Sequence, residues 1–358
     1  MAQFDGRLNQ NEIMGAIYNM IISQQVFASP IAGKEDSLAE KAKVDGSMYG
    51  DTKLYYSTDA LKSYEWGNYA EAENLLSVEK PQSPKCQKLT LDTFRQIKLT
   101  LDDYLSKRAF STETAFSDFT GVMKSWIGNT KKIYEDTLYD CFIGTTKAAG
   151  AAQNITLSDV TSARPADEAA GRFEAMNLGN DLADLLVKMK DYSRDYNDYG
   201  FLRAYRPSDL RIVWNSRYVN RIKNIDMPTI FHQFGLADEL AKDVLPERYF
   251  GTVNTTEKAG DGKTVRSLIE QMINTNHYFP GDVIKVGDTA PANTSYTEDP
   301  LVICKIYGKE SVPFISAFEV GTSFFNPQSL TNSNFLTFGH NTLDYLKEFP
   351  FITIKCAQ

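Results

Sequence analysis

Leu89 to Asp102 reads LTLDTFRQIKLTLD, and the alternation in this stretch decides the fold. Its odd positions are mostly apolar, whereas nearly all of its even positions are polar. An alternation of period two predicts a β-strand with one buried face and one solvent-facing face. The strand would be unusually long, because the run from Leu89 to Leu101 spans roughly 43 Å at about 3.3 Å per residue, and ordinary strands have about five or six residues.

An earlier segment, 53–64, reads KLYYSTDALKSY and could supply an antiparallel partner for this strand. The polar stretch 67–85 between the two strands would be the tip of the hairpin, with a short helix at 70–76. An isolated two-stranded ribbon is only marginally stable in water, so a ribbon of this length needs another surface to lie on. We expect that surface to belong to a neighbouring copy of the chain.

A long helix is predicted directly after the ribbon, over residues 112–143. Apolar side chains recur there at steps of three and four residues, and Ser111 or Thr112 can cap the start. Gly144 stands where a left-handed C-cap belongs. At 1.5 Å per residue the helix would be about 46 Å long, well above the average for globular proteins.

Further elements are predicted from the same periodicities. Ile13 and Ile17 belong to the apolar stripe of a helix at 11–27, which either packs on its own core or reaches a neighbour as an arm. The segment 148–170 is small and polar, so it is interpreted as a surface excursion. We expect helices at 178–196, 231–244 and 265–273, and strands at 211–214, 301–307, 314–320 and 351–356.

The composition describes a folded protein without a dedicated nucleic-acid-binding face. The chain has 358 residues, of which 42% are hydrophobic and 23% charged, with a formal net charge of −8. No long block of like charge occurs, whereas faces that bind phosphates are built from clustered Lys and Arg. The four cysteines are far apart, and the start MAQFDGRLNQNE is unlike a signal peptide. We therefore expect a soluble protein made in the cytosol, with no membrane segment.

No motif of catalysis or cofactor binding is present. The histidines His232, His277 and His340 are widely separated and form no HxxxH or HExxH pattern. The run 262–264 reads GKT, but it lacks the glycine that opens a phosphate-binding loop. We therefore expect no cofactor, no metal site and no catalytic residue. The exception to weigh is a carboxylate such as Asp102 or Asp184 acting as acid or base in an undetected cleft.

The order of elements resembles one family, the major capsid proteins of tailed bacteriophages, whose fold is shared with the herpesvirus capsid floor. The resemblance is carried by the ribbon, by the helical run FSDFTGVMKSWIGNTKKIYEDTLYDCFIG, by NDLADLLVKMKDYSRDY with RIVWNSRYVNRI, and by the closing FLTFGHNTLDYLKEFPFITIKC. It implies an α+β fold with an N-terminal arm (1–45), an extended E-loop hairpin (46–100), a P-domain with a long spine helix (101–175), an A-domain (176–325) and a final P-domain segment (326–358).

The resemblance also implies a function and partners. Copies would assemble into hexamers and pentamers and close an icosahedral head shell around double-stranded DNA, which the shell would not bind sequence-specifically. A separate scaffolding protein and a portal would take part, and the chain would reside in the virion capsid after synthesis in the host cytoplasm. The members of the family are structural proteins, so no enzymatic activity is expected.

Aromatic side chains are dense in and around the predicted ribbon. Tyrosine and tryptophan bury much area at interfaces while leaving a polar tip free to hydrogen-bond. They could instead pack the ribbon onto its own subunit, but a projecting ribbon offers little core of its own to fill, so we favour contact between subunits. The candidates for contact between subunits are Tyr55, Tyr56, Tyr64, Trp66 and Tyr69 in the hairpin, with Ile13 and Ile17 in the arm.

Two other interpretations stay open at this point. The chain could be another virion component, such as a tail protein or a minor shell protein. It could also be an acid/base hydrolase, for example a glycan hydrolase, that uses Asp102 or Asp184.

Overall fold

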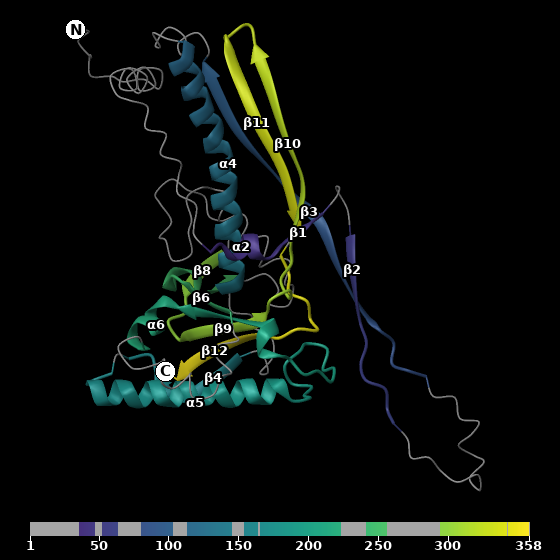
Figure 1. Cartoon of the computed structure of the whole chain (residues 1–358), viewed down its shortest axis with the longest axis vertical. Helices are drawn as coiled ribbons and strands as arrows, with labels where there is room; N and C mark the ends of the chain where they lie inside the picture. Colours follow the sequence, from purple (N-terminus) through teal and green to yellow (C-terminus); the bar gives the residue numbers. More distant parts are fainter. Residues whose placement is uncertain are drawn as a thin grey trace.

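The structure is a computed structural model that describes residues 36–46, 52–63, 80–102, 113–144, 154–163, 165–222, 241–255, 294–341 and 343–357 (Figure 1). In these ranges helices and strands are mixed, which confirms the predicted α+β class. The strands of the described residues form two five-stranded sheets, which we name the long sheet and the body sheet, and one two-stranded sheet. The helices expected at 11–27, 70–76 and 265–273 lie outside the described residues.

The long sheet has the strand order β1, β10, β11, β3, β2. Its strands are β1 (Lys43–Asp45), β2 (Thr52–Ser57), β3 (Lys85–Asp102), β10 (Phe314–Asn326) and β11 (Thr331–Asn341). β3 has 18 residues and is longer than predicted. Between Leu89 and Leu101 its odd positions are the more buried ones, as the alternation predicted.

β3 is shared between two partner strands, which corrects the prediction of a two-stranded ribbon. Thr52–Ser57 pair antiparallel with Lys85–Thr90, as predicted, but residues 91–102 pair with β11. The sequence TNSNFLTFGHN of β11 has no clear alternation, because most of this strand is partly exposed on both faces and is held by backbone hydrogen bonds. Half of the predicted ribbon therefore rests on a sheet of its own chain.

The helix predicted at 112–143 is confirmed as α4 (Glu113–Gly144), which has 32 residues and is about 48 Å long. It runs beside the long sheet (Figure 1). Arg95 Nε donates a hydrogen bond to the Tyr134 hydroxyl at 3.3 Å, and this hydroxyl lies 3.0 Å from Nε2 of the buried His340. These contacts join α4 to β3 and β11.

Gly144 ends α4 for a different reason from the one predicted. Among the described glycines only Gly200 has a positive φ, so Gly144 is not a left-handed cap. A Cβ atom at Gly144 would lie 1.9 Å from the carbonyl oxygen of Tyr249. The position therefore requires glycine because another backbone segment approaches it closely.

The body sheet has the strand order β4, β12, β9, β5, β6. Its strands are β4 (Asn154–Thr161), β5 (Leu210–Asn215), β6 (Ala241–Leu245), β9 (Val302–Gly308) and β12 (Phe351–Ala357). The strands predicted at 211–214, 301–307 and 351–356 are confirmed, and the strand predicted at 314–320 is the start of β10.

Two strands of the body sheet contradict the sequence predictions. β4 lies in the segment interpreted as a surface excursion, but residues 154–157 and Thr161 pair in parallel with β12, and its Leu157 and Val160 side chains are buried. β6 occupies the end of the predicted helix 231–244 and pairs in parallel with β5. Both strands lie at an edge of the sheet, where pairing with a distant strand outweighs local propensity.

The body sheet is covered on both faces. α5 (Glu168–Lys190) packs on one face with Leu178, Leu182, Leu186 and Met189, and the end of α4 contributes to the apolar cluster on the other. α5 begins ten residues before the predicted start at 178, because the Asp167 side chain caps its N-terminus by accepting a hydrogen bond from the Ala170 N–H. It ends at Lys190, before the predicted end at 196. β9 is buried on both faces, and its sequence VICKIYG is apolar except for the buried Lys305.

The remaining elements connect these layers. The sheets do not follow the expected boundary at residue 326, since β10 before it lies in the long sheet and β12 after it lies in the body sheet. The small elements are the helices α2 (Leu38–Lys41) and α6 (Ser216–Ile222), the 3-10 helices η3 (Pro207–Asp209) and η4 (Glu247–Tyr249), and the strands β7 (Gly251–Thr255) and β8 (Thr294–Glu298) of the two-stranded sheet.

Candidate functional site: the hairpin of β2 and β3 and its base

The hairpin formed by β2 and the first part of β3 extends away from the body sheet (Figure 1). Side chains of β2 alternate between its two faces, so the neighbouring tyrosines are in different environments. Tyr55 packs against an apolar cluster of the chain itself, while Tyr56 is 65% exposed. Leu54, 50% exposed, lies on the same face of the strand as Tyr56, and Leu61, after the end of β2, is 78% exposed.

The inward face of the hairpin is anchored by that apolar cluster. Leu89 and Leu91 of β3 are buried against Ile315 of β10 and against Leu346. Tyr55, Ala317 and Phe349 pack around these four residues. Burial of the Tyr55 ring also raises the pKa of its hydroxyl. The hairpin thus has one face used by its own subunit and one face open.

A buried glutamine fixes β3 beside the segment that precedes β12. The Gln87 side chain is 9% exposed. Its Nε2 donates to the Tyr345 carbonyl at 2.8 Å, and its Oε1 accepts from the Lys347 N–H at 3.0 Å. The amide therefore replaces backbone hydrogen bonds that a strand would supply, and both of these backbone groups are satisfied.

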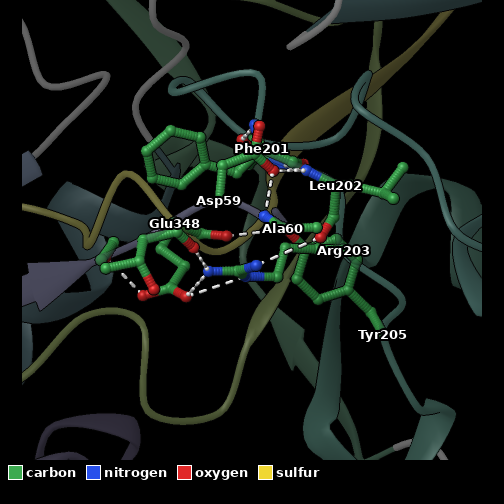
Figure 2. Close-up of polar contacts among 10 residues, drawn as sticks. Asp59, Ala60, Phe201, Leu202, Arg203, Tyr205 and Glu348 are labelled. Atoms are coloured by element: carbon green, nitrogen blue, oxygen red, sulfur yellow. Dashed lines mark hydrogen bonds and ion pairs between the residues drawn. The ribbon is translucent and has the colours of Figure 1, made fainter. Parts of the chain in front are cut away.

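A polar cluster holds the end of β2 to the same region, and we name it the base cluster. It consists of Ser57, Asp59, Arg194, Arg203 and Glu348, which come from three separate parts of the chain (Figure 2). Ser57 Oγ donates to Glu348 Oε2 at 2.5 Å. The hydroxyl of Tyr205 donates to the Glu348 carbonyl at 2.6 Å, and burial raises the pKa of Tyr205 to about 12, so this hydroxyl remains a donor.

Asp59 receives several donors at once. Its Oδ2 lies 2.6 Å from Arg194 Nη1, and its Oδ1 accepts from the N–H groups of Leu202 at 2.9 Å and Ala60 at 2.8 Å (Figure 2). The hydrogen bond from Arg194, with the one from Leu202, lowers the pKa of the Asp59 carboxyl to about 2. The carboxylate is therefore charged throughout the neutral range.

Arg203 joins the two sides of the base cluster. Its Nε donates to Glu348 Oε1 at 2.9 Å, and its Nη2 donates to the carbonyl oxygen of Thr58 at 2.5 Å (Figure 2). The guanidinium also lies 5.7 Å from the centre of the Phe201 ring. One side chain thereby binds the backbone just after β2 and the carboxylate of a distant segment.

Only part of the predicted contact set can be placed. Tyr55 and Tyr56 lie on β2 as predicted, but they face opposite sides. The other predicted residues lie outside the described residues: Tyr64, Trp66, Tyr69, Ile13 and Ile17. Sequence reasoning missed the base cluster, because the side chains of Asp59, Arg203 and Glu348 form their ion pairs with residues at least 135 positions away and carry no local pattern.

A second exposed apolar set lies at the far end of the long sheet, near the turn between β10 and β11. Phe324 is 64% exposed, and Val320, Phe325 and Leu330 are each at least 44% exposed. Single exposed apolar residues are ordinary, but several together on a projecting element are typical of an interaction surface.

The comparison with protein families decides among the interpretations. The family model described as Phi29-like phage major capsid protein matches residues 3–354, nearly the whole chain. The chain belongs to this family. It is a major capsid protein of a phage, and its place in the virion is the capsid. Assembly into hexamers and pentamers of an icosahedral shell fits this family.

Solved phage structures show the same fold. A chain in the capsid structure of Staphylococcus phage Andhra is 12% identical with a TM-score of 0.64, over 94% of this chain and 87% of that one. A chain in the structure of the head fiber and inner core protein gp22 of native bacteriophage P68 is 11% identical with a TM-score of 0.61, over 98% and 88%. No curated protein matches significantly.

For a phage capsid protein, the expected role is structural rather than enzymatic. The carboxylates of the hydrolase interpretation lie at opposite ends of the molecule, since Asp102 ends β3 and Asp184 lies on α5 (Figure 1). Asp184 is ion-paired with Lys188 on the solvent side of this helix. Within the described ranges, none of the helices is long and apolar enough to cross a membrane.

Proposed function

We propose that the hairpin of β2 and β3 is the E-loop of this capsid protein and that its open face contacts a neighbouring copy in the shell. The observation that carries the proposal is the division of β2 into a face that packs on its own subunit and a face that shows Leu54 and Tyr56 to solvent. Exposed aliphatic and aromatic side chains beside each other are the groups that interfaces bury.

We also propose a division of the chain. The arm would be residues 1–45, and the E-loop would begin at residue 46 and end near Thr90, where β3 changes partner. The P-domain would contain α4 and the part of the long sheet formed by β10, β11 and β3 after Thr90. The A-domain would contain the body sheet with α5, including β12. These boundaries follow sheet membership rather than the ends expected from sequence at 100, 175 and 325.

Partners beyond the chain itself follow from the role in the head. We propose that a separate scaffolding protein guides assembly, that a portal occupies one position in the shell, and that synthesis takes place in the host cytoplasm. The packaged double-stranded DNA would meet a chain of net charge −8, which does not favour tight binding of phosphates. Sequence-specific DNA contacts are therefore not part of the proposal.

The experiment replaces the open face of the hairpin in the full chain with a Leu54→Ser, Tyr56→Ser double variant. Exposed positions contribute little to folding, so the free energy of unfolding should change by less than about 1 kcal/mol. Assembly into shells, followed by electron microscopy and light scattering, should be lost or at least strongly slowed, because the interface would lose its apolar anchors.

The matched control is Tyr192→Ser, because Tyr192 is also an exposed tyrosine, at 73%, and lies after α5 in the body. This variant should assemble at the normal rate. Normal shells from the Leu54 and Tyr56 double variant would refute the proposed contact. Equal loss of assembly in the Tyr192 control would also contradict the proposed contact, since loss of any exposed aromatic side chain would then impair assembly.

A further inference from the structure

The tip-side end of the β2–β3 ladder, where Ser57 pairs with Lys85, is held to the body by contacts within one chain, and this fixes the angle of the hairpin. β2 ends at Ser57, and the next two residues run between the loop after α5 and the segment before β12. The base cluster touches every one of these positions: Ser57 through its hydroxyl, Thr58 through its carbonyl oxygen and Asp59 through its carboxylate. A change in the angle of the hairpin at this point would break several charge-assisted hydrogen bonds together.

The loop that supplies the two arginines is itself held rigidly. Ser193 and Arg203 form an antiparallel bridge, and the Asn197 side chain donates to the Phe201 carbonyl at 2.7 Å while it accepts from the Phe201 N–H at 2.8 Å. Gly200 takes a left-handed backbone conformation, with φ of +65°, and its carbonyl accepts from Arg194 Nη1 at 2.8 Å. Arg194 and Arg203 are thus presented from a fixed platform.

Glu348, the acidic partner of Arg203, is also held in place by several hydrogen bonds. Glu348 accepts from Ser57 and Arg203 through different carboxylate oxygens. Its segment is tied to β3 by the Gln87 amide and to the loop after α5 by the Asp198 N–H, which donates to the Lys347 carbonyl at 2.9 Å. Both strands of the hairpin therefore connect to one structure made of two loops.

We propose that Asp59, Arg203 and Glu348 are positioning residues that set the angle of the hairpin in the unassembled subunit, before any neighbour is met. The hairpin is then pre-organised, and assembly does not have to order it. Pre-organisation lowers the free-energy cost of association because the ordering has already occurred during folding. The inference rests on the proposed function in that the hairpin is taken as the contact with the next copy.

The test is amide hydrogen exchange on the unassembled full chain, with Arg203→Gln and Asp59→Asn as variants. In the wild type, residues 52–57 and 85–90 should be protected. Each variant should raise exchange there by about tenfold or more, because hydrogen bonds to charged groups are lost, while residues 91–102 and the body sheet keep their protection. Shell assembly of both variants should slow at an unchanged subunit concentration.

Arg217→Gln is the matched control, since Arg217 forms a similar ion pair with Glu247 at 2.8 Å on the body. It should leave exchange of the hairpin and assembly unchanged. Four results would overturn the inference: fast exchange of the wild-type hairpin, unchanged hairpin exchange in both variants, loss of protection throughout the body, or normal assembly despite a loosened hairpin. Failure of the proposed contact between copies can be distinguished from failure of this inference. The Leu54 and Tyr56 double variant tests that contact while the base cluster stays intact.

Discussion

The body sheet and the long sheet are built from similar strands but differ in how much of each is buried. All seven positions of β9 in the body sheet are buried, whereas the first seven positions of β11 in the long sheet are only partly buried. The body carries two apolar clusters on its two faces. The long sheet is held by strand pairing and by α4 beside it. The comparison indicates that the body supplies most of the buried apolar core, while the long sheet leaves much of its surface exposed.

The largest expected change in stability distinguishes the buried face of α5 from its exposed face. Leu182 of α5 is 2% exposed in the body core, so Leu182→Ala should lower the free energy of unfolding by about 2–5 kcal/mol through lost burial and a cavity. Val187 of the same helix is 52% exposed, and Val187→Ala should change it by less than about 0.5 kcal/mol. Denaturant unfolding of both variants checks this, and equal losses would contradict the assigned faces.

A second prediction concerns the point where α4 enters the body. Gly144→Ala would place a Cβ atom against the Tyr249 carbonyl, so the backbone has to move and the free energy of unfolding should fall by about 1–3 kcal/mol. Gly128 lies in the same helix with no atom within 4 Å of its added Cβ. Gly128→Ala should instead stabilise by up to about 1 kcal/mol. Thermal unfolding compares the two, and a stabilised Gly144→Ala would disprove the close approach.

A third and smaller effect is expected where α4 meets the long sheet. Tyr134→Phe removes the hydroxyl that joins Arg95 and His340 but keeps the ring that packs edge-on against Phe338. The loss should be about 1 kcal/mol, the usual net contribution of a hydrogen bond. Hydrogen exchange should become faster in β3 and β11 while the amides of the body sheet keep their protection. Equal loosening of both sheets would argue against two separately stabilised regions.

The smallest effect is on acid titration at the base of the hairpin. The folded pKa of Asp59 is lowered to about 2, below an unfolded value near 3.9, so its contribution to stability is complete above about pH 4 and is lost as the pH falls towards 2. NMR titration should locate this pKa, and Arg194→Gln should raise it because Arg194 is the main cause. Arg217→Gln should leave it unchanged, and an Asp59 carboxyl that titrates near 3.9 in the wild type would show that the ion pair is absent in solution.

Sequence predicted the elements whose pattern is set by burial. In β3 and in the second half of α4 the buried positions recur along one face, so periods of two and of three to four residues are visible. β11, β4 and β6 were missed because distant strands pair with them: β11 is mostly half exposed on both faces, and β4 and β6 are edge strands. Such strands depend on tertiary contacts that a single sequence does not display.

Part of the candidate site, the tyrosines of β2, could be predicted from the sequence, and part could not. The tyrosines of β2 indicated an interface, yet only the structure shows that Tyr55 belongs to the subunit core and Tyr56 to the open face. The base cluster could not be found from sequence. Ser57 and Glu348 are 291 residues apart, and single charged residues in loops are too common to suggest a partner.

The continuity of β3 has a mechanical consequence. One uninterrupted backbone pairs with β2 at its start and with β11 at eleven positions afterwards, with a single irregularity of register between Leu91 and Thr93. A pull on the hairpin along the strand axis therefore loads the β11 ladder in shear, where many bonds share the force, instead of peeling them apart one at a time. Sideways bending would instead concentrate at that irregularity, so the ladder resists a force along its axis better than a force across it.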